Sequence, residues 1–141
     1  MLRNHQPATG LEAKFSLEFA VASALVAGKV GLNELTDEFV GRPAVREVFA
    51  KVKIDTDDSR CPIEPIFAVN DRVQIVLRDG RTLNSGDIRF ARGNAMAPLA
   101  AADLRTKFMD CAGRASDIDA GTLFGRLMDL RAVPRLRALA R

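Results

Sequence analysis

The run from Leu17 to Ala27 constrains the fold more than any other part of this chain. Only Glu18 and Ser23 interrupt an otherwise apolar sequence, whereas a helix at the surface of a globular protein keeps one polar face. We therefore expect a helix that is buried, either within this chain or against a partner. Gly28 is well suited to end it, because glycine readily adopts the left-handed conformation of a helix C-terminus.

Two starting points for this helix are open. Thr9 and Glu12 have the spacing of a capping box, and Ser16 can also act as an N-cap. We favour Ser16, because Gly10 and the alternating charges of Glu12 and Lys14 suit an extended lead-in.

The next segment carries signals for a turn, a helix and a strand. Thr36 offers a second capped turn with the acidic residues that follow it, and Pro43 can occupy the first position of a helix. That helix carries Val45, Val48 and Phe49 on one face and should end near Ala50. The period-two alternation of residues 51–55 then predicts a half-buried strand.

A β-hairpin is the clearest local signal. Arg72 to Leu77 alternates in polarity and is followed by Asp79-Gly80, a pair typical of tight turns, before the next strand begins at Thr82. Leu83 and Ile88 have opposite parity along that second strand, so they would face opposite sides of a regular sheet. A bulge at Ser85-Gly86 would bring them to one face.

Two helices close the pattern, and the whole order predicts an α+β fold. The first carries Leu104, Phe108 and Cys111 and the second carries Leu123, Phe124, Leu127 and Met128, both at helical spacing. The expected order is α-α-β-β-β-α-α, with a small antiparallel sheet of about three strands that includes the Asp-Gly hairpin. We expect one domain over residues 1–130 and an arginine-rich tail over 131–141.

Charge and composition exclude several classes of protein. The net charge of +3 arises in residues 126–141, where five arginines face only Asp129, and the remaining 16 basic and 17 acidic residues nearly balance. Nucleic-acid binding through this tail is therefore the least favoured function, because a solvated helix end explains the arginines better. No apolar run is long enough for a membrane span or resembles a secretion signal. We expect a soluble cytoplasmic protein whose Cys61 and Cys111 are reduced.

No complete catalytic or metal-binding motif is visible. His5 is the only histidine and is interpreted as a surface or disordered residue, since no serine or cysteine is placed to form a triad with it. The glycines lack phosphate-loop spacing, and neither a cofactor nor a metal site is predicted. Lys14 precedes the N-terminus of the apolar helix, where an anionic ligand would be stabilised. The plainer interpretation is a surface lysine beside Phe15.

A family resemblance goes beyond these local signals. The stretch from Gly10 to Phe19, followed by Ala22 and by Leu25 to Gly28, resembles the C-terminal half of the 2-methylcitrate dehydratase (MmgE/PrpD) family. Further similar motifs follow in order and together span most of residues 7–130: Thr36-Asp37-Glu38, Pro43-x-Val45-Arg46, Asp79-Gly80-Arg81, Arg92-Gly93, Pro98-Leu99 and Lys107-Phe108.

The resemblance implies part of an enzyme. Family members remove a proton or carboxyl group beside a carboxylate of a small polycarboxylic acid without a cofactor, in a cleft between a large N-terminal helical domain and a smaller α+β domain. This chain would be the smaller domain, lacking the helical domain and inactive alone. Its partners would be a polycarboxylate substrate and a helical domain or a second copy in a homodimer.

The resemblance also suggests site residues. Lys14 and Ser16 would help to form the cleft, Phe19 would line it, and Arg92 would hold a substrate carboxylate, since a guanidinium can bind one bidentately. Some family members have a tyrosine at the place of Phe19, and phenylalanine cannot transfer a proton. The alternative function is a non-catalytic assembly module that uses the apolar first helix as its interface.

Overall fold

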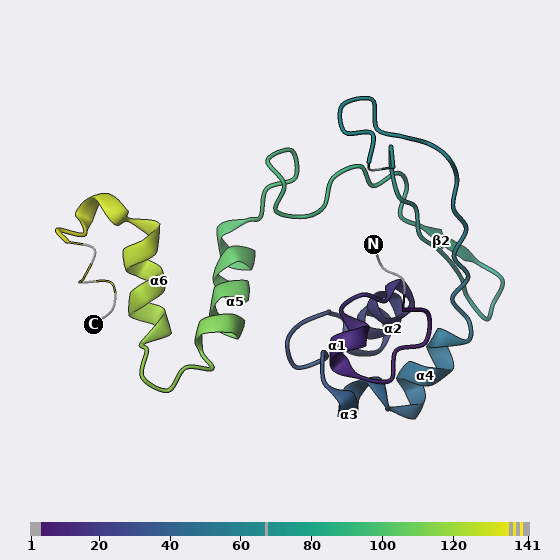
Figure 1. Ribbon diagram of the computed structural model, residues 1–141, viewed down its shortest axis with the longest axis horizontal. Helices are drawn as coiled ribbons and strands as arrows, with labels where there is room; N and C mark the ends of the chain where they lie inside the picture. Colours follow the sequence, from purple (N-terminus) through teal and green to yellow (C-terminus); the bar gives the residue numbers. More distant parts are fainter. Residues whose placement is uncertain (1–3, 67, 136, 138, 140–141) are drawn as a thin grey trace. The chain divides into compact units, whose positions relative to one another are not determined.

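The computed structural model describes residues 4–66, 68–135, 137 and 139. The chain divides into two units, one formed by residues 1–54 and 107–141 and the other by residues 55–106. The first unit contains the N-terminal helices and the second contains the hairpin (Figure 1). Helix α5 (Ala101–Ala112) runs from the second unit into the first. Parts of the predicted tail, at positions 136, 138, 140 and 141, lie outside the described residues.

Both predicted starting points are helix N-caps. Thr9 caps α1 (Gly10–Ala13) with a complete capping box to Glu12, and Ser16 caps α2 (Leu17–Ala27), which ends at Gly28 with φ of 71°. The expectation of an extended lead-in before Ser16 is wrong, because the reciprocal hydrogen bonds of Thr9 and Glu12 fold residues 10–13 into a helical turn.

The remaining N-terminal helices follow the sequence closely. Thr36 caps α3 (Asp37–Val40), and Pro43 begins α4 (Pro43–Phe49), whose C-cap is Ala50. Helix α2 packs on α4, and α1 packs on α3. The hydrophobic core lies among these helices and is formed by Ala13, Phe19, Ala22, Phe39, Val40, Val45 and Phe49.

Helix α2 is only half buried within this unit. Its buried stripe contains Glu18, Phe19, Ala22 and Ser23, at the spacing that places residues on one face. The last turn of the helix is apolar yet exposed, with exposed fractions of 52% for Leu25 and 40% for Val26. The prediction of a buried helix is therefore met along the stripe from Glu18 to Ser23, while the described residues leave the last turn uncovered.

The strand predicted over residues 51–55 does not form. Instead the amides of Lys51 and Val52 continue the turn after α4 by donating to the carbonyls of Val48 and Phe49, at 2.9 and 3.3 Å. Residues 52–55 have no regular secondary structure, since no strand edge among the described residues pairs with them. Among the described residues, the sheet therefore has two strands and not about three.

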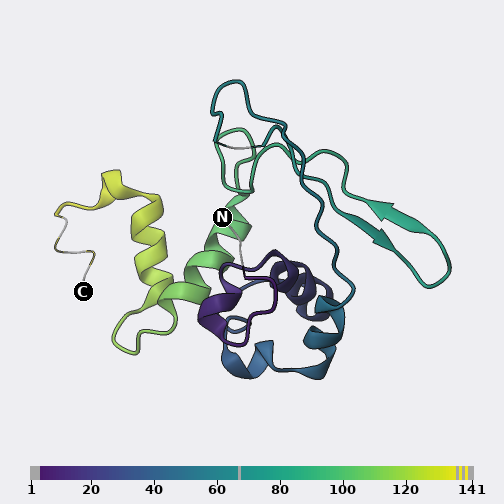
Figure 2. The same ribbon diagram turned by 45° about the vertical axis from the view of Figure 1, so that its right-hand side comes forward.

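The hairpin consists of β1 (Gln74–Val76) and β2 (Thr82–Asn84), paired antiparallel (Figure 2). At the turn, the Gly80 amide donates to the carbonyl of Leu77 at 3.0 Å, and the Leu77 amide donates to the carbonyl of Arg81 at 2.8 Å. Gly80 has a φ of 84°, which confirms that the Asp-Gly pair supplies the positive φ of the turn.

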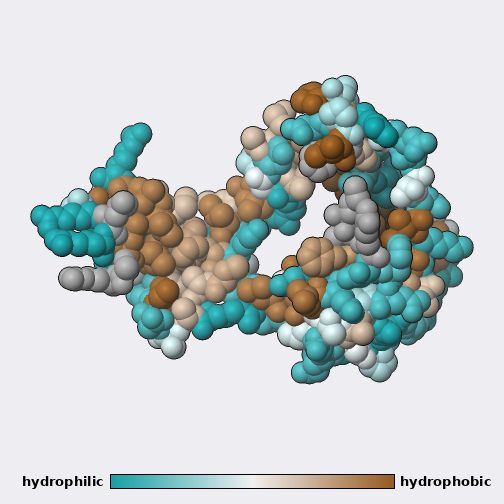
Figure 3. Space-filling view, in the orientation of Figure 1, coloured by the Kyte–Doolittle hydropathy of each residue, from teal (hydrophilic) through white to brown (hydrophobic). Residues whose placement is uncertain are grey.

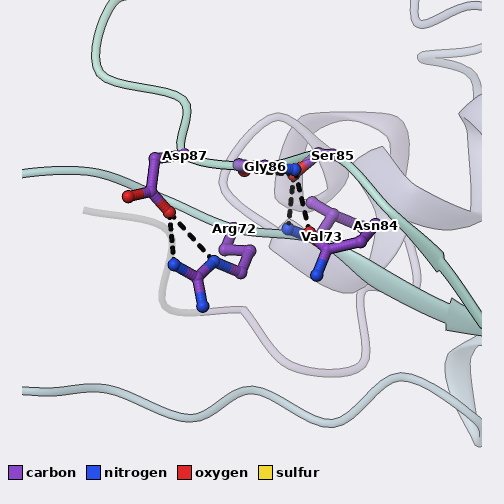
Figure 4. Close-up of polar contacts among 6 residues, drawn as sticks. All are labelled: Arg72, Val73, Asn84, Ser85, Gly86 and Asp87. Atoms are coloured by element: carbon purple, nitrogen blue, oxygen red, sulfur yellow. Dashed lines mark hydrogen bonds and ion pairs between the residues drawn. The ribbon is translucent and has the colours of Figure 1, made fainter.

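The predicted bulge is present next to this ladder (Figure 4). Gln74 pairs with Asn84, while the next bridge joins Asp71 to Ile88, so the second strand has one more residue between the two pairs than the first. Gly86 has a φ of 68°, and the Val73 amide donates to the Ser85 hydroxyl at 2.9 Å. An extra residue with a left-handed glycine is the usual form of such a bulge.

The C-terminal helices form a second helical pair. Phe108 of α5 and Phe124 of α6 (Ala120–Met128) lie with their ring centroids 5.3 Å apart, and a 3₁₀ turn, η1 (Leu130–Ala132), follows. Arg114, between the two helices, donates to Asn33 at 2.6 Å. Hydrophobic side chains gather on the surface over α5 and α6 (Figure 3), including Leu104, Leu127, Met128 and Leu130.

Candidate functional site

The predicted site residues fall in both units. Lys14, Ser16 and Phe19 belong to the first unit and Arg92 to the second. The first three lie at the junction of α1 and α2, where Ser16 begins the second helix.

Ser16 has its hydrogen-bonding capacity used within the domain. It is 1% exposed, and its hydroxyl accepts from the Phe19 amide at 3.2 Å and donates to Oε2 of Glu18 at 3.3 Å. The side chain therefore both caps α2 and orients a neighbouring carboxylate.

Phe19 lies in the hydrophobic core. It is 1% exposed, and its ring makes edge-to-face contacts with Phe39 and Phe49 at centroid distances of 6.2 and 6.5 Å. Such aromatic pairs stabilise a core beyond the area they bury. Phe19 thus holds α2 against α3 and α4.

Lys14 is an exposed cation at the same junction. Its side chain forms no hydrogen bond or ion pair with any residue that the structure describes, and its neighbours Leu11 and Phe15 are exposed apolar residues. An unpaired ammonium beside apolar side chains is able to receive an anionic group from a partner or ligand.

Arg92 is also exposed but is already paired. Its guanidinium donates to Oδ2 of Asp103 at 2.8 Å, and the two side chains are 76% and 50% exposed. Exposed pairs of this kind are weak, so another carboxylate can replace Asp103 at little cost.

One polar group was missed by the sequence reasoning. Nδ1 of His5 lies 2.8 Å from Oε1 of Glu18, although the two residues are 13 positions apart. The contact forms because the chain turns back at α1, where the Asn4 amide donates to the carbonyl of Phe15 at 3.0 Å. His5 is exposed, as predicted, but no periodicity or motif indicates that a carboxylate holds its ring.

The environment of Glu18 favours its charged form. Burial raises the pKa of Glu18, but hydrogen bonds from its own backbone amide, from His5 and from Ser16, together with the charge of His5, outweigh burial and hold the pKa below its usual value. This carboxylate lies in the first turn of α2, where it already complements the helix dipole. The anionic ligand expected beside Lys14 would therefore meet an internal anion at this helix end.

Other chemistry-bearing groups are more dispersed. Cys61 and Cys111 are free. Hydrogen bonds from the backbone amides of Glu64 and Ile63, with a further contribution from Arg89, hold the pKa of the Cys61 thiol below its usual value.

Among the described residues, no group of three or more histidine, cysteine or acidic side chains is placed to hold a metal ion. No described helix has the length and apolar character needed to cross a membrane.

Comparison with known proteins decides the family. Residues 1–122 match the MmgE/PrpD C-terminal domain. The chain belongs to the MmgE/PrpD family. A similar curated protein is cis-aconitate decarboxylase from Mus musculus, which is 30% identical over 98 residues. The aligned region covers 69% of this chain but only 19% of that relative. The chain therefore matches about a fifth of the relative's length.

Membership of this family supports a lyase-like role at the level of the family. The α1–α2 junction, which carries three of the four predicted site residues, lies within the matched region, as does Arg92. The C-terminal part of α6 and the 3₁₀ turn lie beyond it.

Proposed function

We propose that this chain is the smaller domain of a cofactor-independent lyase or isomerase that acts on a small polycarboxylic acid and is inactive by itself. The observation that carries the proposal is the family match over residues 1–122. The similarity to a cis-aconitate decarboxylase suggests a tricarboxylate as the substrate class.

The exposed cations give this domain a role in substrate binding. Lys14 carries a charge that no described residue neutralises, and Arg92 can exchange its exposed partner Asp103 for a substrate carboxylate. A bidentate contact from the guanidinium would fix the orientation of the acid. Ser16 and Phe19 would shape the wall of the cleft by holding the α1–α2 junction in place.

Inactivity of the isolated domain follows from the chemistry. Removal of a proton beside a carboxylate needs a base, and departure of a hydroxyl or carboxyl group needs a second positioned group and a site closed to water. We propose that the family's helical domain supplies the remaining groups and the opposite wall.

The test compares the purified chain with the same chain joined to, or mixed with, a helical domain of this family. We expect no turnover of cis-aconitate or 2-methylcitrate by the chain alone and turnover by the assembled protein. Lys14→Gln and Arg92→Gln should each raise KM by about tenfold or more, since a charge-assisted hydrogen bond contributes roughly 1.5–3 kcal/mol.

Matched exposed cations serve as controls. Lys53→Gln and Arg78→Gln remove charges from the same two units at exposed positions and should leave KM unchanged. Turnover by the isolated chain would refute the domain's dependence on a partner, and an equal effect of all four variants would refute the assigned binding roles.

The second candidate is an assembly module without chemistry, and a specific surface favours it. The exposed apolar residues of this region are Leu17, Leu25 and Val26 of α2 and the neighbouring Leu11 and Phe15. Sets of this kind usually mark contact sites. This candidate predicts that the domain binds a helical domain or a second copy, that Leu25→Asp abolishes the complex in sedimentation, and that the complex turns over no polycarboxylate.

A further inference from the structure

We propose that His5, oriented by Glu18, is a proton-transferring residue of this domain. The imidazole is exposed to solvent and contacts a buried carboxylate. Nδ1 of His5 lies 2.8 Å from Oε1 of Glu18, and the exposed fractions of the two side chains are 72% for His5 and 9% for Glu18. This inference rests on the proposed function, since it assigns a group to that reaction.

The carboxylate is fixed from several sides. Oε2 of Glu18 accepts from the Ser16 hydroxyl at 3.3 Å, while Oε1 meets the imidazole. Ser16 is in turn held as the N-cap of α2. A buried carboxylate behind an exposed histidine is the arrangement that sets the orientation and tautomer of a catalytic imidazole.

Attachment of the N-terminal segment does not require this contact. The Asn4 amide donates to Phe15, the Asn4 side chain donates to the carbonyl of Glu12 at 3.0 Å, and the Ala8 amide donates to the Glu12 carboxylate at 2.7 Å. Arg46 also donates to the carbonyl of Pro7 at 2.7 Å. Residues 4–8 are therefore anchored on both sides of His5 by other groups, so the contact between His5 and Glu18 is not needed to hold the segment in place.

The contact determines which ring nitrogen is reactive. An ionised carboxylate only accepts hydrogen bonds, so Nδ1 carries the proton that points to Glu18. In the neutral ring the lone pair is then on Nε2, which has no hydrogen-bond partner among the described residues. The charge of Glu18 stabilises the imidazolium that forms when Nε2 accepts a proton.

The proposed step is a proton transfer from carbon. The C–H bond beside a substrate carboxylate breaks, the proton moves to Nε2, and the electron pair remains on the substrate, delocalised into the carboxylate. In a dehydration this pair forms the double bond as the β-carbon–oxygen bond breaks. The leaving hydroxide takes a proton from the imidazolium and departs as water, which restores the neutral ring.

The first experiment measures the tautomer in the full chain. His5 is the only histidine, so ¹⁵N NMR reports on one ring without assignment ambiguity. We expect the Nδ1–H tautomer when the ring is neutral, and a shift toward the Nε2–H form in Glu18→Gln, whose amide can also donate. Predominance of the Nε2–H form in the wild-type chain would overturn the proposal.

The second experiment measures catalysis in the assembled two-domain protein. We expect His5→Gln to lower kcat by about 100-fold or more with little change in KM, as loss of an acid–base group does. Glu18→Gln should lower kcat less and change the tautomer, as a positioning residue does. Gln6→Ala, at the exposed neighbouring position, is the matched control and should leave kcat unchanged.

The outcomes separate the two proposals. If the wild-type assembly turns over a polycarboxylate and His5→Gln is equally active, only the role of His5 is refuted. If the wild-type assembly turns over none, the proposed function fails and the role of His5 fails with it. An unfolding midpoint of His5→Gln equal to that of Gln6→Ala shows that any loss of kcat is chemical.

Discussion

Phe19 and Glu18 are consecutive residues of α2 with opposite chemical surroundings. Phe19 packs edge-to-face against Phe39 and Phe49 in the core, while Glu18 is buried among hydrogen-bond donors and holds His5. Sequence reasoning identified the importance of Phe19 from a motif. It could not identify the surroundings of Glu18, because these depend on how α1 turns the chain back on itself.

Phe19→Tyr should destabilise the domain. The added hydroxyl enters a position where the residue is 1% exposed, and a buried hydroxyl without a partner costs about 1–3 kcal/mol. Phe15→Tyr is the control, because Phe15 is 51% exposed and should change the free energy of unfolding by less than about 0.5 kcal/mol. Urea unfolding measures both. Equal stabilities would show that the para position of Phe19 opens onto a polar cleft.

Glu18→Gln should destabilise the domain in a pH-dependent manner. The lowered pKa of Glu18 means that its contribution is fully present above the ordinary value of 4.5 and is lost as the pH falls through the lower value of the folded state. At pH 7 the free energy of unfolding of the variant should be lower than that of the wild type by about 1–3 kcal/mol. This difference should become smaller toward pH 3. Glu38→Gln, a control at an exposed position, should differ little from the wild type in its free energy of unfolding. A difference in free energy of unfolding between Glu18→Gln and the wild type that does not vary with pH would contradict this account.

Helices and the hairpin were predicted more reliably than the strand that does not form. The caps at Ser16 and Thr36, the proline at the first position of α4 and the left-handed Gly80 depend on residues within a few positions of each other. The bulge was also predictable, because Leu83 and Ile88 can share a face of the sheet only if an extra residue lies between them. A strand over residues 51–55 depends on a distant edge, and nothing in local alternation tells whether that edge exists.

Two glycines with open space around them test the role of the bulge. A Cβ at either Gly86 or Gly125 would meet no atom within 4 Å, but only Gly86 has a positive φ, of 68°. Gly86→Ala should therefore cost about 1–2 kcal/mol, seen as faster amide exchange at Val73 and Ser85. Gly125→Ala, within α6, should stabilise its helix by about 0.5–1 kcal/mol. Equal effects of the two changes would mean that the positive φ is not needed.

The two units differ in whether they have a core. The first contains every buried hydrophobic residue of the described chain, whereas no described residue of 55–106 is buried. The prediction of one domain over residues 1–130 stays a prediction. Hydrophobic patterns show which residues are apolar but not whether neighbours cover them. The comparison is compatible with a partner domain, because most of cis-aconitate decarboxylase lies outside the region aligned with this chain.

Hydrogen exchange should separate the units. Amides of α2 and α4 should be protected up to the global free energy of unfolding, because they surround the core. Amides of residues 56–70 should exchange with little protection in the isolated chain. In the assembled protein, protection should extend into residues 55–106. Uniform protection of the isolated chain would show that the second unit is stable without a partner.

The bulge also affects how the gene can vary. Residue 86 is the surplus residue of its strand, so an in-frame deletion of its codon would leave Asp71 opposite Ile88 and Gln74 opposite Asn84 in an uninterrupted ladder. Loss of the codon for Leu83 would instead shift the paired residues of β2 and turn their side chains to the other face. Among shortened descendants of this gene, deletions within the hairpin strands should therefore concentrate at codon 86.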